Sequence, residues 1–369
     1  MKLTIQKDQL LKGLQTVQSV VNTSTTLPII TNVLLEADGD KLKLTATDLD
    51  VTITCEVEAK VKTAGTTTVS AKKIFGITRE FDGDEVEIEV DANSVCCLRS
   101  GPSVYRINGL PADEFPPMPK MSGGKTFKLS CEDAKQMFQR TSFAMSTDVA
   151  RYILNGAMLV ASEGSVMTVA TDGRRLALAS CETEIKKANF GQFILPGKTV
   201  AEIARLLQDK GDVEITYTES HASLSLSGKD VLAATVLTKL VEGSFPNYKQ
   251  IIPEKSAERV GVKREEILRA LRRAEIMINE KSASVKLAFG KNKLTISANA
   301  PEIGDATEDI VLKYKGKEMA IAVNPKYLID PLSALEDAEV FFEMNDDISP
   351  VVVKVNGPFL YVVSPMRLQ

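Results

Sequence analysis

The sequence repeats itself three times at a spacing of about 125 residues, and this constrains the fold more than any other feature. One marker, a strand-like segment that ends in Asp or Asn, recurs at offsets of 124 and 127 residues at Asp48, Asp172 and Asn299. A second, a lysine after a short apolar run, recurs at offsets of 126 and 128 residues at Lys72, Lys198 and Lys326. A Phe-Pro marker joins only two copies, at Phe115 and Phe245. The chain is therefore predicted to contain three copies of one domain.

Proline- and glycine-rich segments fall between the predicted copies. Residues 116–124 contain Pro-Pro-Met-Pro and Ser-Gly-Gly, and residues 253–258 form a shorter polar linker. We expect three domains, at residues 1–121, 125–252 and 258–369.

Each copy is predicted to be α+β, with two helices packed on antiparallel β-sheet. Apolar residues with helical spacing predict helices near residues 7–20, 70–81, 130–141, 197–210, 263–276 and 325–337. Alternating segments at 51–57, 86–90 and 351–355 predict strands with one buried face. Ser130 is expected to cap its helix. Pro331 lies inside the last predicted helix, so a kink or an early break is expected there.

Composition narrows the possible chemistry. The single histidine, His221, excludes sites that need two imidazoles, and the 5% aromatic content argues against a stacking platform for single-stranded nucleic acid. Five cysteines suggest reduced thiols, and the sequence shows neither a signal peptide nor a long apolar run. We expect a cytoplasmic protein that does not enter a membrane.

Motifs that resemble catalytic sites are incomplete. Gly197-Lys198-Thr199 lacks the earlier glycine of a phosphate-binding loop, and Ser70 with Lys73 lacks the partner motifs of serine acyl enzymes. A capped helix start explains both segments better.

Isolated polar residues also have simpler explanations. Asp48 with Asp50, and Asp82 with Asp84, are expected at turns after strands rather than at a metal or acid–base site. Cys96 and the other cysteines lack zinc-ligand spacing, and His221 has no orienting partner. We therefore expect no catalytic residues, no metal and no cofactor.

Positive charge is concentrated in the predicted helices. The six helical windows together carry +4, whereas the whole chain carries −4, so the remainder carries about −8. For one helix a solvated face would explain such charges, but the same bias in a threefold repeat favours a polyanion facing the helices. The basic residues at exposed helix positions are Lys12, Lys72, Lys73, Arg79, Arg140, Lys198, Arg205, Arg269, Arg272 and Arg273.

Several longer motifs carry a family resemblance that extends over the whole chain. They are Thr26-Leu27-Pro28-Ile29, Leu110-Pro111-Ala112-Asp113-Glu114-Phe115-Pro116, Arg151-Tyr152-Ile153-Leu154-Asn155-Gly156, Val169-Ala170-Thr171-Asp172-Gly173-Arg174-Arg175-Leu176, the segment 239–248 and the tail Pro365-Met366-Arg367-Leu368. In this order and at these spacings, the sequence resembles the bacterial DNA polymerase III beta subunit family, the sliding clamps.

The resemblance implies a head-to-tail ring of two protomers with helices around a central hole, which encircles double-stranded DNA without reading sequence and acts as a processivity factor. The residues it places toward DNA are Lys12, Lys72, Arg79, Arg151, Tyr152, Lys198 and Arg205. The residues it places at the dimer interface are Lys73, Ile276 and Met277. Ser24, Pro102 and Val104 depart from the family pattern, which predicts weaker DNA and interface contacts at these places.

The resemblance also implies a hydrophobic pocket that binds short peptides of the replicative polymerase, the clamp loader and other partners. Its residues would be Leu154, Thr171, Gly173, Arg174, Arg175, Leu176, Pro246, Ile251, Tyr327, Val362, Pro365, Met366, Arg367 and Leu368. Ser364 and Gln369 are departures in the tail. Two alternatives remain at this point: a protein-binding scaffold that does not encircle DNA, and a nucleotide-dependent enzyme that uses residues 197–199.

Overall fold

A computed structural model describes residues 1–21, 27–119, 121, 123–229, 231–279 and 283–366. The chain divides into two compact units. Unit 1 comprises residues 1–135 and 198–240, and unit 2 comprises residues 136–197 and 241–369. Helices α3 and α4 cross the boundaries between the units.

Unit 1 contains two antiparallel sheets, ordered β5-β1-β7-β8-β9 and β10-β15-β16-β17-β4-β3-β2-β6. Its strands are β1 (Lys2–Gln6), β2 (Asn32–Asp38), β3 (Lys41–Thr47), β4 (Val51–Glu58), β5 (Lys60–Thr63), β6 (Gly65–Ser70), β7 (Glu85–Val90), β8 (Val95–Ser100), β9 (Ser103–Asn108), β10 (Lys125–Ser130), β15 (Asp212–Tyr217), β16 (His221–Ser227) and β17 (Ala234–Lys239). Its helices are α1 (Lys7–Gln18), α2 (Ala71–Glu80) and most of α4 (Gly197–Leu206). Short 3₁₀ helices lie at η1 (Pro28–Thr31) and η2 (Ala112–Glu114).

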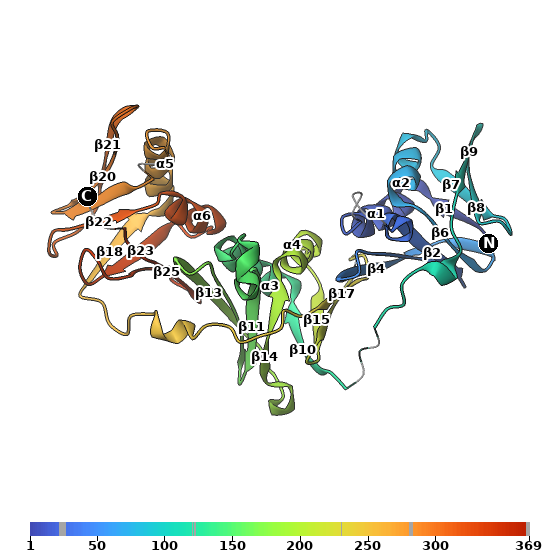
Figure 1. The fold of residues 1–369 in the computed structure, drawn as a ribbon, viewed down its shortest axis with the longest axis horizontal. Helices are drawn as coiled ribbons and strands as arrows, with labels where there is room; N and C mark the ends of the chain where they lie inside the picture. The colour runs from blue at the N-terminus through green and yellow to red at the C-terminus, as the bar shows by residue number, and fades with distance from the viewer. Residues whose placement is uncertain (22–26, 120, 122, 230, 280–282, 367–369) are drawn as a thin grey trace. The chain divides into compact units, whose positions relative to one another are not determined.

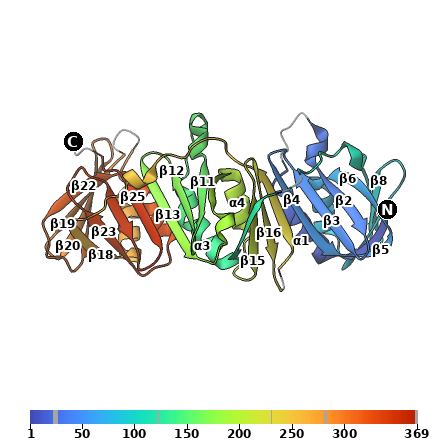
Figure 2. The ribbon, with the colours of Figure 1, turned by 90° about the horizontal axis from the view of Figure 1, so that it is seen from below.

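The helices of unit 1 pack their apolar faces on the sheets. Leu10, Leu14 and Val17 of α1 are fully buried, as is Ile74 of α2. Figure 1 shows α1 and α2 on the same side of the strands, and in Figure 2 the sheet β2-β3-β4-β6 lies in front of α1.

Unit 2 also contains two antiparallel sheets, ordered β14-β11-β12-β13-β25-β24-β23-β18 and β21-β20-β19-β22. Its strands are β11 (Gly156–Ser162), β12 (Ser165–Thr171), β13 (Arg175–Glu182), β14 (Gly191–Pro196), β18 (Glu258–Lys263), β19 (Val285–Gly290), β20 (Lys293–Ala300), β21 (Gly304–Val311), β22 (Met319–Val323), β23 (Glu339–Met344), β24 (Val351–Lys354) and β25 (Phe359–Val363). Its helices are most of α3 (Cys131–Thr141), then α5 (Arg264–Glu275) and α6 (Lys326–Ala334). Short 3₁₀ helices lie at η3 (Ser142–Ala144), η4 (Val149–Leu154), η5 (Lys187–Asn189) and η6 (Tyr248–Gln250).

The strand order repeats three times, as the sequence predicted. The first strand order of each copy is β1-β7-β8-β9, β10-β15-β16-β17 and β18-β23-β24-β25. The second is β6-β2-β3-β4, β14-β11-β12-β13 and β22-β19-β20-β21. Each eight-stranded sheet joins two copies, because the last strand listed in the first order of one copy pairs with the last strand listed in the second order of the copy before it. Thus β17 pairs with β4, and β25 pairs with β13. The predicted α+β class with two helices per copy is confirmed.

One predicted alignment is wrong by one residue. The hairpins β2–β3, β11–β12 and β19–β20 have the same two-residue turn, after which the second strand begins at Lys41, Ser165 and Lys293. Counting from these residues aligns Asn299 with Thr171 rather than with Asp172. The residues around the two positions are similar, so the shift becomes visible only when residues are counted along the paired strands.

Of the kink or early break expected at Pro331, the break is wrong, because α6 continues to Ala334. A proline at this place removes the N–H that would donate to the carbonyl four residues earlier, which belongs to Tyr327. The Tyr361 hydroxyl of β25 donates to that carbonyl instead. A side chain from the neighbouring sheet thus replaces the missing helical hydrogen bond.

Turns and caps follow the sequence-based interpretation. The Ser130 hydroxyl accepts from the Asp133 N–H at 3.0 Å, which caps α3. Asp48 accepts from the N–H groups of Asp50 and Val51, so it holds a turn rather than forming half of a catalytic pair.

Candidate peptide-binding site and basic helix surfaces

An apolar cluster fills the interior of unit 2 beneath the predicted pocket. Its buried members are Met158, Val169, Leu176, Ile194, Tyr248, Val352 and Val362, with Ile153, Phe245 and Ile252 among the partly buried residues packed against it. Leu176 of β13 pairs directly with Val362 of β25. The shared sheet therefore brings the second and third copies together at this place.

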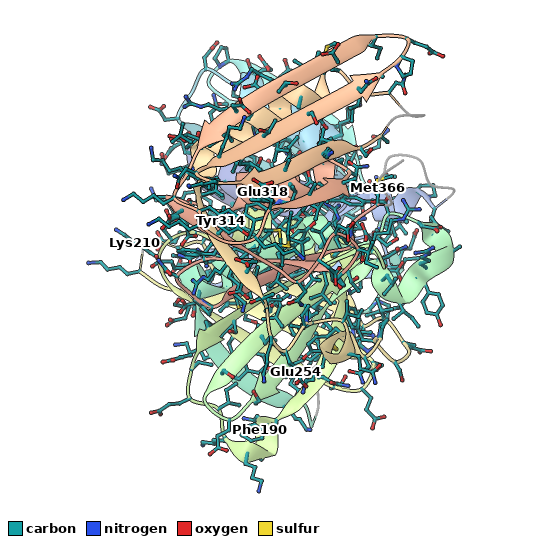
Figure 3. All side chains as sticks on the ribbon, turned by 90° about the vertical axis from the view of Figure 1, so that its left-hand side faces the viewer. Phe190, Lys210, Glu254, Tyr314, Glu318 and Met366 are labelled. Atoms are coloured by element: carbon teal, nitrogen blue, oxygen red, sulfur yellow. The ribbon has the colours of Figure 1, made fainter. Side chains whose placement is uncertain are left out.

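The C-terminal segment leaves β25 and pairs with β22, the end strand of the four-stranded sheet of unit 2. The Ser364 N–H donates to the Arg174 carbonyl at 3.0 Å, and the Met366 N–H donates to the Ala322 carbonyl of β22 at 2.7 Å. Leu110 and Val241 make the corresponding bonds to β6 and β14 in the other two copies. Backbone pairing thus fixes Met366, yet its side chain is 43% exposed at the surface of unit 2 (Figure 3).

Several apolar residues predicted to line the pocket remain exposed in unit 2. Ile251 is 42% exposed, and Pro246 is exposed two residues before the buried Tyr248. Leu154, Tyr327 and Pro365 are half-buried. Exposed apolar side chains above a buried apolar cluster suit a short peptide with hydrophobic residues.

Arg175 organises the residues beneath this surface. Its guanidinium donates to Asp172 at 3.0 Å, to Asp330 of α6 at 2.7 Å and to the Phe143 carbonyl at 2.7 Å. It also lies over the Tyr327 ring, 4.8 Å from the centroid. Arg175 is only 8% exposed, so it positions its neighbours and has little surface with which to touch a ligand.

The turn before Arg175 is equally well fixed. Asp172 accepts from the N–H groups of Arg174 and Arg175, Thr171 accepts from the Gly173 N–H, and Gly173 has a φ of 87° that favours glycine. Arg174 is exposed, and its guanidinium lies 3.5 Å from the Tyr327 hydroxyl. Among the predicted pocket residues that the structure describes, Arg174 is the exposed cation.

All described members of the predicted pocket belong to unit 2. Thr171, Arg175, Leu176 and Val362 are buried, and the other described members are exposed or half-buried. Arg367, Leu368 and Gln369 lie outside the described residues, as does Ser24. Sequence analysis missed the supporting roles of Asp330, Phe143 and Tyr361. The placement of Asp330 four residues after Lys326 on α6, where the two form a 3.1 Å ion pair, was the one local signal.

The predicted DNA-facing residues divide between the two units. Lys12 (α1), Lys72 and Arg79 (α2), and Lys198 and Arg205 (α4) belong to unit 1, and all five are exposed. Arg151 and Tyr152 lie in η4 of unit 2, where Tyr152 is 58% exposed. Arg151 donates to the Asp172 carbonyl at 3.1 Å, which links η4 to the peptide site.

Three of these cations already have partners within unit 1. Lys198 forms an ion pair with Asp48, Arg79 pairs with Glu80 at 2.9 Å, and Arg205 contacts Glu202 at 3.0 Å and the end of α1. In contrast, Lys12 and Lys72 form no ion pair with any described residue. The positive charge available to a ligand is therefore greatest at Lys12 and Lys72.

The predicted interface residues lie at helix ends. Lys73 is exposed in the first turn of α2. Ile276 follows α5 and is 74% exposed, and Met277 is half-buried beside it. An isoleucine this exposed at the end of a helix suits burial by another chain.

The described residues offer little for catalysis. They contain no group of three His, Cys, Asp or Glu side chains that could hold a metal. Burial raises the pKa of the Cys55 and Cys96 thiols to about 12, which opposes thiolate formation. Among these residues, no helix has the length and apolar character needed to cross a membrane.

Three repeats of two helices on antiparallel sheet, with an apolar surface where the second and third copies share a sheet, define the DNA-clamp class of proteins. Three domain models of the DNA polymerase III beta subunit together match most of the chain. The N-terminal domain model matches residues 1–119, the central domain model residues 128–247 and the C-terminal domain model residues 249–367. The chain belongs to the DNA polymerase III beta subunit family.

Individual relatives agree over their full lengths. The beta sliding clamp of Pseudomonas aeruginosa is 35% identical over 373 residues, with 100% of both chains covered. That of Chlamydia muridarum is 33% identical over 368 residues, with 100% of this chain and 99% of the relative covered. A crystal structure of the Pseudomonas aeruginosa clamp bound to griselimycin has a TM-score of 0.94 at 34% identity, and one of the Bacillus subtilis clamp has a TM-score of 0.93 at 29% identity, each covering 100% of both chains. The chain has the function of a sliding clamp, and the comparisons support this rather than a scaffold that does not encircle DNA.

Proposed function

We propose that two copies of this chain close head to tail into a ring that encircles double-stranded DNA and tethers the replicative polymerase to it. The observation that carries this proposal is the repeated strand order. The repeat specifies three junctions, which are the strand pairings that join one copy to the next. Two of them, β17–β4 and β25–β13, form within the chain. The third would join β9 to β21, and each of these strands lies at the end of its sheet. A second copy can supply that pairing at both ends, which closes a ring.

The two internal junctions specify the register of the third. Val236 lies opposite Ile53 at one, and Tyr361 lies opposite Ala177 at the other. Counted from the hairpin turns, the corresponding residues of β9 and β21 are Tyr105 and Ala306.

This register places complementary charges together. With Tyr105 opposite Ala306 in an antiparallel pair, Arg106 lies opposite Asp305 of the partner protomer. Lys73, Ile276 and Met277 would lie near this pairing as the remaining interface residues. The interface would thus combine backbone pairing, an exposed ion pair and burial of Ile276.

The basic helix residues would meet the phosphates of the encircled duplex. Contacts from Lys12, Lys72, Arg79, Arg151, Tyr152, Lys198 and Arg205 would attract DNA without reading its sequence, and salt would weaken them. Closure rather than affinity would retain the DNA, so weak contacts favour sliding.

The surface around Met366 would bind short peptides of partner proteins, with the replicative polymerase and the clamp loader among them. A bound polymerase stays at a high effective concentration near its primer end. The chain itself would perform no catalysis. We further propose that it works in the cytoplasm and that its domains comprise residues 1–121, 125–252 and 258–369.

Retention on circular DNA tests encirclement. After loading onto a closed plasmid, the protein should remain bound in high salt and dissociate once one restriction cut linearises the circle. A nicked plasmid, which remains circular, is the matched control and should retain the protein. Equal loss from circular and linear DNA contradicts the proposal.

A further inference from the structure

The end of α1 is capped by an arginine from another copy of the repeat. Arg205 of α4 donates to the Thr16 carbonyl at 2.9 Å and contacts the Gln15 carbonyl at 3.5 Å. It also donates to the Ser19 hydroxyl at 2.6 Å and to Glu202. The last four carbonyls of a helix lack helical partners and carry partial negative charge, so a guanidinium stabilises them.

The first helix of the second copy also has an arginine at its end, but this arginine comes from the same copy. Arg175 of β13 donates to the carbonyl of Phe143, which lies two residues beyond the end of α3. An arginine therefore satisfies a carbonyl at the end of the first helix in two copies, and the Arg205 contact is the one that joins two copies.

Arg79 has the position that a second contact between copies requires. Helices α2 and α4 are both ten residues long, and Arg79 and Arg205 are each the ninth residue. The Arg79 side chain is 63% exposed, pairs with its neighbour Glu80 at 2.9 Å and lies over the Phe75 ring, 5.9 Å from the centroid. Its planar group therefore has donors available for a partner.

The end of α5 matches the end of α1. Both helices have twelve residues, so Arg272 and Arg273 correspond to Gln15 and Thr16, and Ile276 corresponds to Ser19. Arg273 is neutralised by two 2.7 Å contacts with Glu308 of β21, and Glu275 ends the helix with a negative charge. The carbonyls at this end can therefore accept from another cation.

We infer that Arg79 of one protomer caps the C-terminal end of α5 in a second copy of this chain, by donating to the main-chain carbonyls of Arg272 and Arg273. The inference rests on the proposed ring and gives Arg79 a role in closing it, beyond its expected contact with DNA. The planar guanidinium suits two carbonyls at once, which a lysine cannot match.

Dimer dissociation measured by sedimentation equilibrium tests the contact. Two identical interfaces must break when a ring separates into monomers. The free-energy cost of a substitution therefore counts twice in the dimer dissociation constant. Arg79→Ala should raise the dimer dissociation constant about a hundredfold, from roughly tenfold at each interface. Arg79→Lys keeps the charge and should recover only part of this loss.

Controls separate the contact from general effects. Lys210 protrudes from the surface (Figure 3) and forms no ion pair with a described residue. Lys210→Ala removes the same charge and should leave the dimer dissociation constant unchanged. Matching thermal unfolding of the Arg79→Ala and wild-type monomers would show that the fold is intact. If the wild type dimerises and Arg79→Ala dissociates within twofold of it, the contact is wrong and the ring stands. A wild type that stays monomeric at micromolar concentration overturns both.

Discussion

The hydroxyl of Tyr361 donates to the main-chain carbonyl of Tyr327, the carbonyl that Pro331 leaves without a helical donor. Tyr361 is fully buried, and this burial raises its pKa far above the ordinary value for tyrosine, so the hydroxyl keeps its proton. One hydrogen bond thus connects α6 to β25, whose next residue, Val362, is one of the residues proposed for the peptide site.

Removing that hydroxyl should destabilise the protein. Tyr361→Phe leaves the Tyr327 carbonyl buried without a donor, and we expect a loss of about 1–3 kcal/mol in the free energy of unfolding. Urea denaturation measures this loss. Pro331→Ala restores a helical N–H, so the same Tyr361 substitution should cost less in that background. Equal costs in both backgrounds would show that the hydroxyl does not replace the proline's missing bond.

The repetition explains which features could be predicted from sequence. Helix and strand types depend on local periodicity, which residues such as Leu10 and Leu14 display clearly. The roles of Arg175 and Tyr361 depend on partners up to 155 residues away in sequence, which no local pattern indicates. The residues of the proposed peptide site were predicted only through family resemblance. Without it, the apolar tail around Met366 would suggest simple packing against its own domain.

Peptide binding should depend on the exposed methionine. Met366→Ala combined with Leu368→Ala should weaken binding of a clamp-motif peptide at least tenfold, because apolar contact is lost while the Met366 backbone bond remains. Fluorescence anisotropy with a labelled peptide measures the affinity. Ile348→Ala is the control, since Ile348 is 74% exposed in unit 2 but belongs to no part of the site. Undiminished affinity in the double variant would refute the pocket assignment, and the dimer should stay intact.

Acid should weaken the attachment of β21 to α5. Hydrogen bonding from Arg273 lowers the pKa of Glu308 below its ordinary value. A lowered folded-state pKa contributes stability that is present above the unfolded value, about 4.3, and is lost as the pH falls through the folded value. The difference in unfolding free energy between wild type and Glu308→Gln should therefore be largest near pH 7 and should shrink toward pH 3 as the Glu308 carboxylate takes up a proton. Urea denaturation across this range measures it, and in an Arg273→Ala background the Glu308→Gln difference should be small at every pH.

Charge exchange at the proposed third junction tests both its existence and its register. Arg106 and Asp305 are each exposed on an edge strand, β9 and β21. Arg106→Glu replaces an attraction worth about 0.2–1 kcal/mol with a repulsion between like charges, and the ring contains this pair twice. The dimer dissociation constant should rise about tenfold or more in low salt and less in high salt. Asp305→Arg should have the same effect, and the two substitutions together should restore the wild-type value within about threefold. If the double variant dissociates as readily as either single variant, these residues do not face each other and the register is different.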